Sequence, residues 1–401
     1  MYSKNKRVVL MSDDLFNFDA APERRGSACY KWDSVADGVL PLWVADMDFP
    51  AAPCIKKVLE DRVAHGVFGY VKVPDAYYDA LIGWFASRHR WTMRREWVIY
   101  TSGVVPAISA IIKAVTSPGD KVLVQTPVYN CFFSSIRNNG CSVEENELVF
   151  ADGSYTIDFA DFESKVSDPA VRVFLLCNPH NPAGRVWSAD ELRRMGELCL
   201  KHGVFVVADE IHCEMVSPGY SYTPYGTLPA ELQDNVAVCT SPSKAFNIAG
   251  LQIANISVPN ADYRRKIDKA ININEVCDVN AFGVEALQAA YNEGGPWLDA
   301  VNAYIYKNYQ LLCSFVAEQL PRVSVCRLEG TYLAWLHLDG FPPSSEVARL
   351  LEEEYGVKLS PGQLYGRKAG RDFLRLNLAC PQSVLTEALA RLKKGLDAVA
   401  G

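Results

Sequence analysis

The chain has 401 residues, of which 49% are hydrophobic and 22% are charged, and its formal net charge is -7. This length allows a large domain and a smaller one, and the composition is typical of an ordinary globular enzyme rather than of a disordered or fibrous chain. The acidic balance argues against general binding to nucleic acid or to an anionic membrane, because such binding needs an excess of Lys and Arg.

Neither a secretory signal nor a membrane span is predicted. The apolar run Val8 to Met11 is too short for the core of a signal peptide, and no apolar run reaches the roughly 18 residues that a membrane span requires. The 12 cysteines are scattered, mostly inside apolar runs, and form no C-x-x-C pair. We therefore expect a cytoplasmic protein with reduced, buried thiols, without a disulfide framework and without a metal site.

The first fifty residues are irregular and rich in aromatic residues, so we expect them to lie across a core that the rest of the chain forms. From Ala52 the pattern becomes helical and ends at Gly66, and a second amphipathic helix follows. The apolar positions of these two helices are Ile55, Val58, Leu59 and Val63, and then Tyr78, Leu81, Ile82 and Phe85.

After the expected strand 97–100, the small residues of the turn Thr101 to Pro106 lead into an apolar helical run, 107–115. A strand, a short turn and a helix N-terminus together can bind phosphate through backbone N–H groups and the helix dipole. The match to a glycine-rich fingerprint is poor, so an ordinary strand-to-helix turn explains the pattern equally well.

Apolar strands then alternate with helices, which predicts an α/β fold with a mainly parallel sheet covered on both faces. The expected strands are 121–125, 171–177, 204–208 and 236–239. The helix between the second and third of these begins with a capping box, Ser188 with Glu191, and ends at Gly203.

From about residue 292 the order changes to helices and short strands, which suggests a second, smaller α+β domain. We predict a large domain over 52–291 and a small domain made of 1–51 and 292–401. The expected elements of the latter part are helices over 304–320, 347–355 and 385–399, and strands over 331–338 and 373–377.

Three strand ends in the large domain carry unusual polar residues. Asn178 to Gly184 has a proline after both asparagines, Asp209 directly follows an apolar strand, and Lys244 follows another strand between small hydroxyl residues. Taken singly, each has an ordinary explanation: a rigid turn, a helix N-cap and a solvated lysine, with His212 a buried core histidine. Ligands of parallel sheets, however, gather where strands end.

Together, an amine nucleophile, a carboxylate, an oriented amide and a phosphate-type turn fit the chemistry of pyridoxal 5'-phosphate (PLP). The chain resembles the fold-type I PLP-dependent enzymes of the class I/II aminotransferase superfamily, and specifically the MalY/PatB group of cystathionine β-lyases, or C–S lyases. The likeness extends over nearly the whole chain and includes the segments 65–70, 209–212, 243–248, 331–335 and 375–377.

This resemblance implies a role for each matching residue. Lys244 would form a Schiff base with PLP, Asp209 would face the ring nitrogen, and Asn181 the ring hydroxyl, close to His212, where many relatives have a tyrosine. Tyr129 would stack on the ring, whereas the backbone of Val104 and Val105 and the hydroxyls of Ser241 and Ser243 would hold the phosphate. Arg375 would grip the substrate carboxylate, and Tyr70 would reach the phosphate of a neighbouring subunit in a homodimer. Lys244, Asp209 and Tyr70 are the expected catalytic residues.

Gln252 departs from typical aminotransferases, which carry a phosphate-binding arginine eight residues after the lysine. The lyase group also lacks that arginine, so the resemblance implies β-elimination from L-cystathionine or related L-cysteine S-conjugates, within methionine biosynthesis. An aminotransferase and a PLP-binding regulatory protein without turnover are the alternatives. Residues that either close or line the site, or serve ordinary packing, are Trp43, Asp46, Asp48, Phe132 and Trp335.

Overall fold

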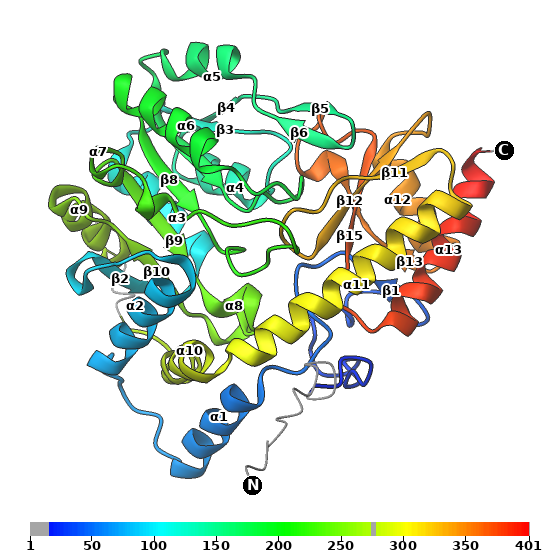
Figure 1. The fold of residues 1–401 in the computed structure, drawn as a ribbon, viewed down its shortest axis with the longest axis horizontal. Coiled ribbons are helices and arrows are strands. Elements are labelled where there is room, and N and C mark those ends of the chain that lie inside the picture. Colours follow the sequence, from blue (N-terminus) through cyan, green and yellow to red (C-terminus); the bar gives the residue numbers. More distant parts are fainter. Residues whose placement is uncertain (1–15, 274–277, 401) are drawn as a thin grey trace, which may run out of the picture.

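The computed structural model describes residues 16–273 and 278–400 (Figure 1). The apolar run Val8 to Met11 and Cys277, which entered the expectations above, lie outside the described residues. Figure 1 shows a larger and a smaller main sheet, and the long helix α11 (Gly295–Gln319) runs from beside α8 (Pro242–Ala245) to the smaller one.

In the described part of the chain, seven strands form the larger sheet, in the order β2-β10-β9-β8-β7-β3-β4. All pairings are parallel except those of β10, which is antiparallel to both neighbours, so the predicted mainly parallel sheet is confirmed. The strands are β2 (Val98–Thr101), β3 (Lys121–Val124), β4 (Ser142–Glu145), β7 (Val171–Cys177), β8 (Phe205–Asp209), β9 (Val236–Thr240) and β10 (Ala254–Ser257).

Helices cover both faces of this sheet, because the central strands are apolar on both sides. Along β7, Val173 and Leu175 pack with one core, whereas Phe174 and Leu176 pack with the other. The first core includes side chains of α3 (Val104–Val115), α4 (Cys131–Asn138) and α9 (Ala261–Asn272), and the second those of α5 (Phe159–Val166) and α6 (Ala189–Lys201). The predicted capping box of Ser188 and Glu191 begins α6.

The smaller sheet is antiparallel, with the order β11-β12-β15-β14. The expected strand 331–338 begins later, at Leu333, because Thr331 has a left-handed φ of 71° that extended strands do not adopt. The expected helix 304–320 is the C-terminal part of α11, which begins earlier, at Gly295, and ends at Gln319. The remaining elements are β11 (Val323–Val325), β12 (Leu333–Leu338), β14 (Ser360–Pro361), β15 (Phe373–Asn377), α12 (Ser344–Glu353) and α13 (Gln382–Ala400).

The N-terminal segment lies across these elements, as predicted. Its strand β1 (Leu40–Pro41) pairs in parallel with β13 (Val357–Lys358), and the ring of Phe18 packs against Phe49 and Trp297. The strands of the larger sheet fall before residue 291 and those of the smaller sheet after it. The division into domains at this boundary stays a prediction.

The helix α1 (Pro53–His65) ends at Gly66 as predicted, with a left-handed φ of 75° at this glycine. The predicted apolar face is only partly buried: Ile55 is buried, but Val63 is 58% exposed. The helix packs against α10 (Ala281–Glu293), which leaves its other side uncovered in a single chain. The second predicted helix is α2 (Asp75–His89), and here Leu81 and Phe85 are buried.

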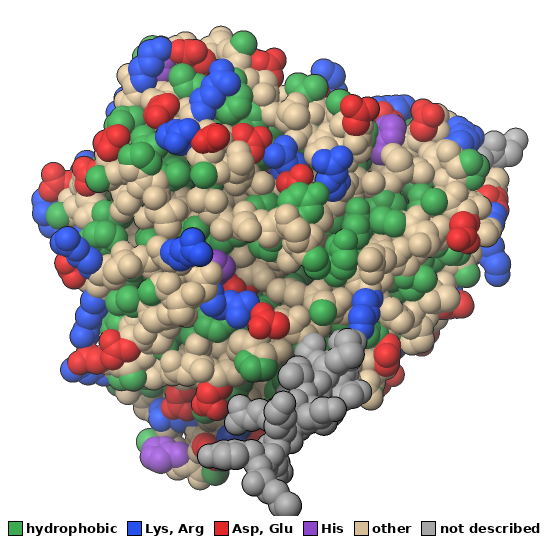
Figure 2. All heavy atoms as spheres, in the orientation of Figure 1, with side chains coloured by type: hydrophobic (Ala, Val, Ile, Leu, Met, Phe, Trp, Pro, Cys, Tyr) green, Lys and Arg blue, Asp and Glu red, His purple; other side chains and the backbone are tan. Residues whose placement is uncertain are grey.

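The surface charges and the cysteines can be compared with what the composition predicts. Figure 2 shows Lys and Arg interspersed with Asp and Glu over the face in view. No helix in residues 16–273 and 278–400 is both long and apolar enough to cross a membrane. All described cysteines are free thiols, but the expectation of burial is wrong for four of them, which are half-buried: Cys29, Cys54, Cys131 and Cys313.

Candidate active site

The carboxyl ends of β7, β8 and β9 meet at a cavity of about 200 Å³. Parallel neighbouring strands bring their following loops to the same edge, which is why residues far apart in sequence meet here. Of the predicted site residues, those lining the cavity are Val104, Val105, Tyr129, Asn181, Asp209, His212, Ser243 and Lys244. Ser241, Arg375 and Tyr70 are not part of this lining.

Lys244 lies on the one-turn helix α8, which begins directly after β9. Its amine donates a hydrogen bond to the backbone carbonyl of Ala45, with Nζ and O 2.6 Å apart. Burial lowers the pKa of Lys244 to about 8, with the cation of Arg375 acting in the same direction and the carboxylates of Asp46 and Asp209 acting against it. An amine with a lowered pKa is suited to nucleophilic and proton-transfer chemistry.

Ser241 holds the turn that carries Lys244. Its hydroxyl accepts a hydrogen bond from Ser243 N–H at 3.0 Å and donates one to the Ile253 carbonyl at 2.7 Å. The side chain is buried and engaged in this N-cap, so its placement does not support the predicted contact with phosphate. Ser243, in contrast, lies in the cavity wall.

Asp209 and His212 form the wall at the end of β8. The carboxylate of Asp209 accepts a hydrogen bond from Ile211 N–H at 3.1 Å, and burial raises its pKa to about 7. Burial also lowers the pKa of His212 to about 3, assisted by the positive charges of Lys244 and Arg375, so its imidazole is neutral. A cation placed against Asp209 would favour the ionised carboxylate.

Arg375, on β15, reaches the same site from the smaller sheet. Its Nη1 donates to Asn181 Oδ1 at 3.0 Å, and its Nη2 donates to the Trp43 carbonyl at 2.7 Å. The guanidinium also lies over the ring of Tyr365, 4.7 Å from the centroid. The pair of Asn181 and Arg375 thus joins the predicted cofactor amide to the predicted substrate arginine.

The end of the cavity near α3 is the expected phosphate site. Val104 and Val105 open this helix, so their N–H groups belong to a helix N-terminus, which favours anions. Gln252 also lines the cavity, in a left-handed conformation with φ of 52°. The position at which typical aminotransferases carry a phosphate-binding arginine therefore lies at the site, and the neutral amide of Gln252 occupies it.

The aromatic residues divide into two groups. Tyr129 lines the cavity, where burial is the largest cause that raises its pKa. Phe132 packs edge-on against Tyr129 and is fully buried, and Trp335 stacks on Phe373, so both serve the core rather than the cavity lining. Tyr70 is 98% exposed and takes no part in the cavity of its own chain.

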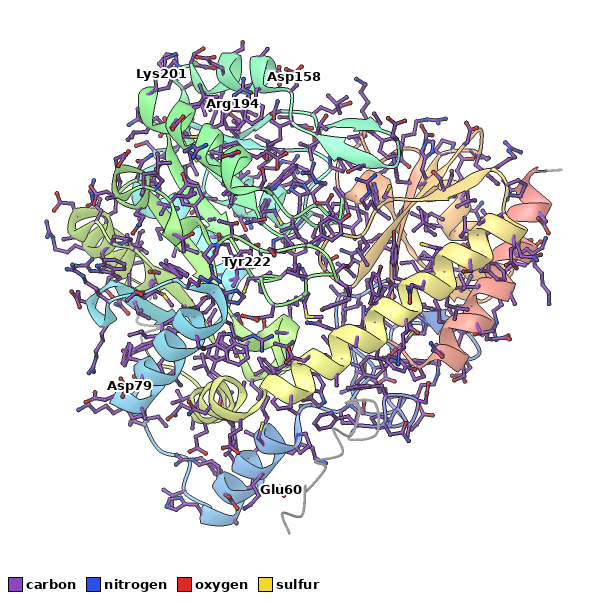
Figure 3. All side chains as sticks on the ribbon, in the orientation of Figure 1. Glu60, Asp79, Asp158, Arg194, Lys201 and Tyr222 are labelled. Carbon is purple, nitrogen blue, oxygen red and sulfur yellow. The ribbon has the colours of Figure 1, made fainter. Side chains whose placement is uncertain are left out.

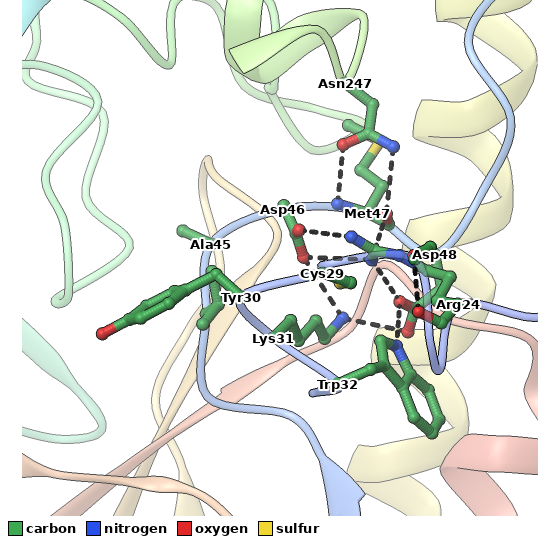
Figure 4. Close-up of polar contacts among 12 residues, drawn as sticks. Arg24, Cys29, Tyr30, Lys31, Trp32, Ala45, Asp46, Met47, Asp48 and Asn247 are labelled. Carbon is green, nitrogen blue, oxygen red and sulfur yellow. Dashed lines mark hydrogen bonds and ion pairs between the residues drawn. The ribbon is translucent and has the colours of Figure 1, made fainter. Parts of the chain in front are cut away.

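A segment that we name the strap, residues 43–48, covers Lys244 through contacts that the sequence does not predict. The Ala45 carbonyl accepts from Lys244 and also from Tyr332 Oη, at 2.9 Å. Asn377 donates to the carbonyls of Val44 and Asp46, and Asn247 donates to those of Met47 and Phe49. Asn247 also accepts from Met47 N–H, and Figure 4 shows the contact of Asn247 with Met47. Since these bonds end on backbone groups of the strap and its neighbour Phe49, the side chains of the strap give little signal of them.

The residues around the cavity fit PLP. Two buried nitrogen atoms, His212 Nδ1 and Arg375 Nε, have no hydrogen-bond partner among the described residues. Such groups normally find a partner in a ligand or in ordered water. His212 lies around one cavity with an amine, a carboxylate and a helix N-terminus, which are the groups that an aldehyde, a ring nitrogen and a phosphate require, and Arg375 contacts Asn181 of the same lining. Within the described residues, no group of three His, Cys, Asp or Glu is placed to hold a metal ion.

Comparison with known proteins agrees with this geometry. The chain matches the family described as aminotransferase class I and II over residues 37–392. It is 42% identical to cystathionine beta-lyase PatB of Bacillus subtilis over 387 residues, covering 95% of this chain and 100% of the relative. It is 33% identical to protein MalY of Escherichia coli over 393 residues, covering 96% of this chain and 100% of MalY.

The structure of cystalysin from Treponema denticola, which contains a PLP cofactor, is similar with a TM-score of 0.92 and 34% identity, over 96% of this chain and 99% of that one. The predicted fold type I and the resemblance to the MalY/PatB group are thereby confirmed. PLP is the cofactor of this family. The chain belongs to the class I and II aminotransferases, a family of PLP-dependent enzymes.

Proposed function

We propose that this protein is a PLP-dependent carbon–sulfur β-lyase that converts L-cystathionine, or a related L-cysteine S-conjugate, into a thiol, pyruvate and ammonia. The observation that carries the proposal is the cavity in which the Lys244 amine, with its lowered pKa, lies with Asp209 and with Asn181, which Arg375 contacts. The relatives PatB, named a cystathionine beta-lyase, and MalY support the choice of reaction.

Position in the cavity wall supports the proposed binding roles. Lys244 would hold the aldehyde of PLP, Asp209 the ring nitrogen, Asn181 and His212 the ring oxygen, and Tyr129 the ring face, whereas Val104, Val105 and Ser243 would hold the phosphate. PLP, when bound, supplies an electron sink for the electron pair that is left at the substrate Cα. Arg375 would bind the α-carboxylate through paired N–H groups, since its Nε has no partner among the described residues.

The chain's own residues would then move the proton. The neutral Lys244 amine takes the proton from Cα, and the bond between Cβ and sulfur breaks, with its electron pair leaving on sulfur. The sulfur takes up a proton to give the thiol, homocysteine when the substrate is cystathionine. The remaining three-carbon fragment takes up water and ends as pyruvate and ammonia.

The test is the release of pyruvate from L-cystathionine by the PLP-loaded protein without any 2-oxo acid. Lys244→Ala is expected to reduce this release by at least about 10³-fold, because it removes both the anchor and the base. Lys201→Ala is the matched control, since Lys201 lies on the outer surface of α6 and pairs with Glu163 (Figure 3). Activity that requires a 2-oxo acid acceptor would instead indicate an aminotransferase, and PLP binding without any turnover a regulatory protein.

We also propose a homodimer in which Tyr70 reaches the phosphate site of the partner subunit. The exposure of Tyr70, together with that of Val63, Val67 and Phe68 on and after α1, supports a contact surface in this region. A cytoplasmic location is supported by the free thiols of the described cysteines. A role in methionine biosynthesis follows if homocysteine is the thiol released.

A further inference from the structure

Four charged side chains fix the strap, and the function proposed above uses none of them (Figure 4). Asp46 and Asp48 belong to the strap, whereas Arg24 and Lys31 come from the preceding segment. A nitrogen of Arg24 lies 2.7 Å from an Asp46 oxygen and another 2.6 Å from Asp48. Lys31 Nζ lies 2.9 Å from Asp48 and 3.6 Å from Asp46, so two cations face two anions.

Burial distinguishes the two carboxylates of this cluster. The side chains of Lys31 and Asp48 are 0% and 3% exposed, and Asp48 also accepts a hydrogen bond from Trp32 Nε1 at 2.8 Å. A buried pair of this kind holds only when both charges are present. The Asp46 side chain is 23% exposed, and Asp46 directly follows Ala45, whose carbonyl accepts the hydrogen bond from Lys244.

Charged and titratable groups from several elements face the Lys244 amine. They are Asp46 from the strap, Arg375 from β15, Asp209 and His212 from the end of β8, and Cys131 from α4. Burial is the largest influence on the pKa of Lys244, and the carboxylate of Asp46 is the largest among the charged neighbours. Tyr332 donates to the same carbonyl as Lys244 and so restrains its acceptor.

We propose that Asp46 is a positioning residue for Lys244: its ion pairs with Arg24 and Lys31 hold the Ala45 carbonyl against the amine, and its charge sets the pH at which the amine loses its proton. The inference deepens the proposed function, because Lys244 must be neutral to take the Cα proton. The segment 24–48 would thus influence proton transfer at Lys244 without contacting the substrate.

The test compares Asp46→Asn with Asp48→Asn, two substitutions of equal size in one cluster. In the full-length chain freed of PLP, the acylation of Lys244 by acetic anhydride is followed against pH by peptide mass spectrometry. Asp46→Asn is expected to lower the pH midpoint of Lys244 acylation by about 0.5 to 1 pH unit, because a negative charge that stabilises the protonated amine is lost. Asp48→Asn is expected to leave the midpoint in place, although it breaks the more buried pairs.

A third variant should shift the midpoint of Lys244 acylation in the opposite direction, and it replaces Asp46→Asn if that variant does not fold. Arg24→Gln removes a cation that opposes the Asp46 charge, so the midpoint should rise. In the PLP-loaded protein, the pH titration of the bound cofactor's visible absorption should move in the same directions.

Equal midpoints for Asp46→Asn and Asp48→Asn, or a downward shift for Arg24→Gln, would overturn the inference and leave the cluster a purely structural role. The labelling needs no turnover. If the midpoints separate as stated but the wild type releases no pyruvate, the proposed function fails while the role of Asp46 stands.

Discussion

At Arg375 the proposed grip on the substrate depends on the shape of the side chain as well as on its charge. The planar guanidinium already bonds to Asn181 and to the Trp43 carbonyl, and a third donor, Nε, has no partner among the described residues. A lysine would keep the charge but could not make these bonds together with a paired contact to a carboxylate.

We therefore expect Arg375→Lys to lower kcat/KM for cystathionine about 10- to 100-fold, mainly through KM, which corresponds to roughly 1.5 to 3 kcal/mol for a hydrogen bond to a charged group. Arg185→Lys is the control, because Arg185 is also shielded but is ion-paired with Glu329 and Glu191, which do not line the cavity, whereas Arg375 contacts Asn181 of the lining. Steady-state kinetics decide: similar losses in both variants would mean that buried arginines matter only for stability.

At the scale of elements, the connection that follows β8 depends on a buried carboxyl group. Glu210 is fully buried, accepts hydrogen bonds from Tyr222 Oη and Tyr225 N–H, and so ties the end of β8 to η3 (Tyr225–Thr227). Figure 3 places Tyr222 near the middle of the molecule. Burial raises the pKa of Glu210 from 4.5 to about 8. The folded protein therefore holds a proton that the unfolded chain releases between these two values.

Folding stability should then fall as the pH rises through this window, by up to about 1.4 kcal/mol per pH unit for this one proton. Glu210→Gln keeps a neutral group at the site, so its unfolding free energy should exceed that of the wild type at pH 8 and approach it near pH 5. Urea unfolding at three pH values measures the gap. Glu214→Gln is the contrast: this buried carboxylate pairs with Arg88, and its loss should destabilise the protein at each pH. A pH-independent gap for Glu210→Gln would contradict the assignment.

Sequence was a good guide where the determinants are local. The capping box of α6, the left-handed Gly66 after α1 and the bounds of β7 and β15 follow from neighbouring residues alone. Sequence was a poor guide where distant backbone decides. The strand β10 contains polar residues and is defined by its pairing with β2 and β9, and the strap binds Lys244 through a carbonyl that any residue possesses. The resemblance to a family supplied Asn181 and Arg375, whose 3.0 Å contact joins residues 194 apart.

For the whole molecule, the proposed dimer makes each site depend on two chains. Lys244 lies in the cavity of its own subunit, whereas Tyr70 is 98% exposed and would serve the partner's site. Tyr70→Ala and Lys244→Ala homodimers should each be defective at both sites. In a hybrid of the two, one site carries both substitutions and the other carries neither.

Mixing the two defective variants under conditions that exchange subunits should therefore restore activity. Random reassociation makes about half of the dimers hybrid, each with one intact site of two, so about a quarter of wild-type pyruvate release is expected. The mixture of Lys244→Ala with Asp209→Ala is the control: both residues serve the same chain's cavity, so every site in its hybrids has one defect and no activity returns. If the Tyr70→Ala mixture also stays at the sum of its parts, then Tyr70 does not act across the interface, and the exposed surface after α1 needs another explanation.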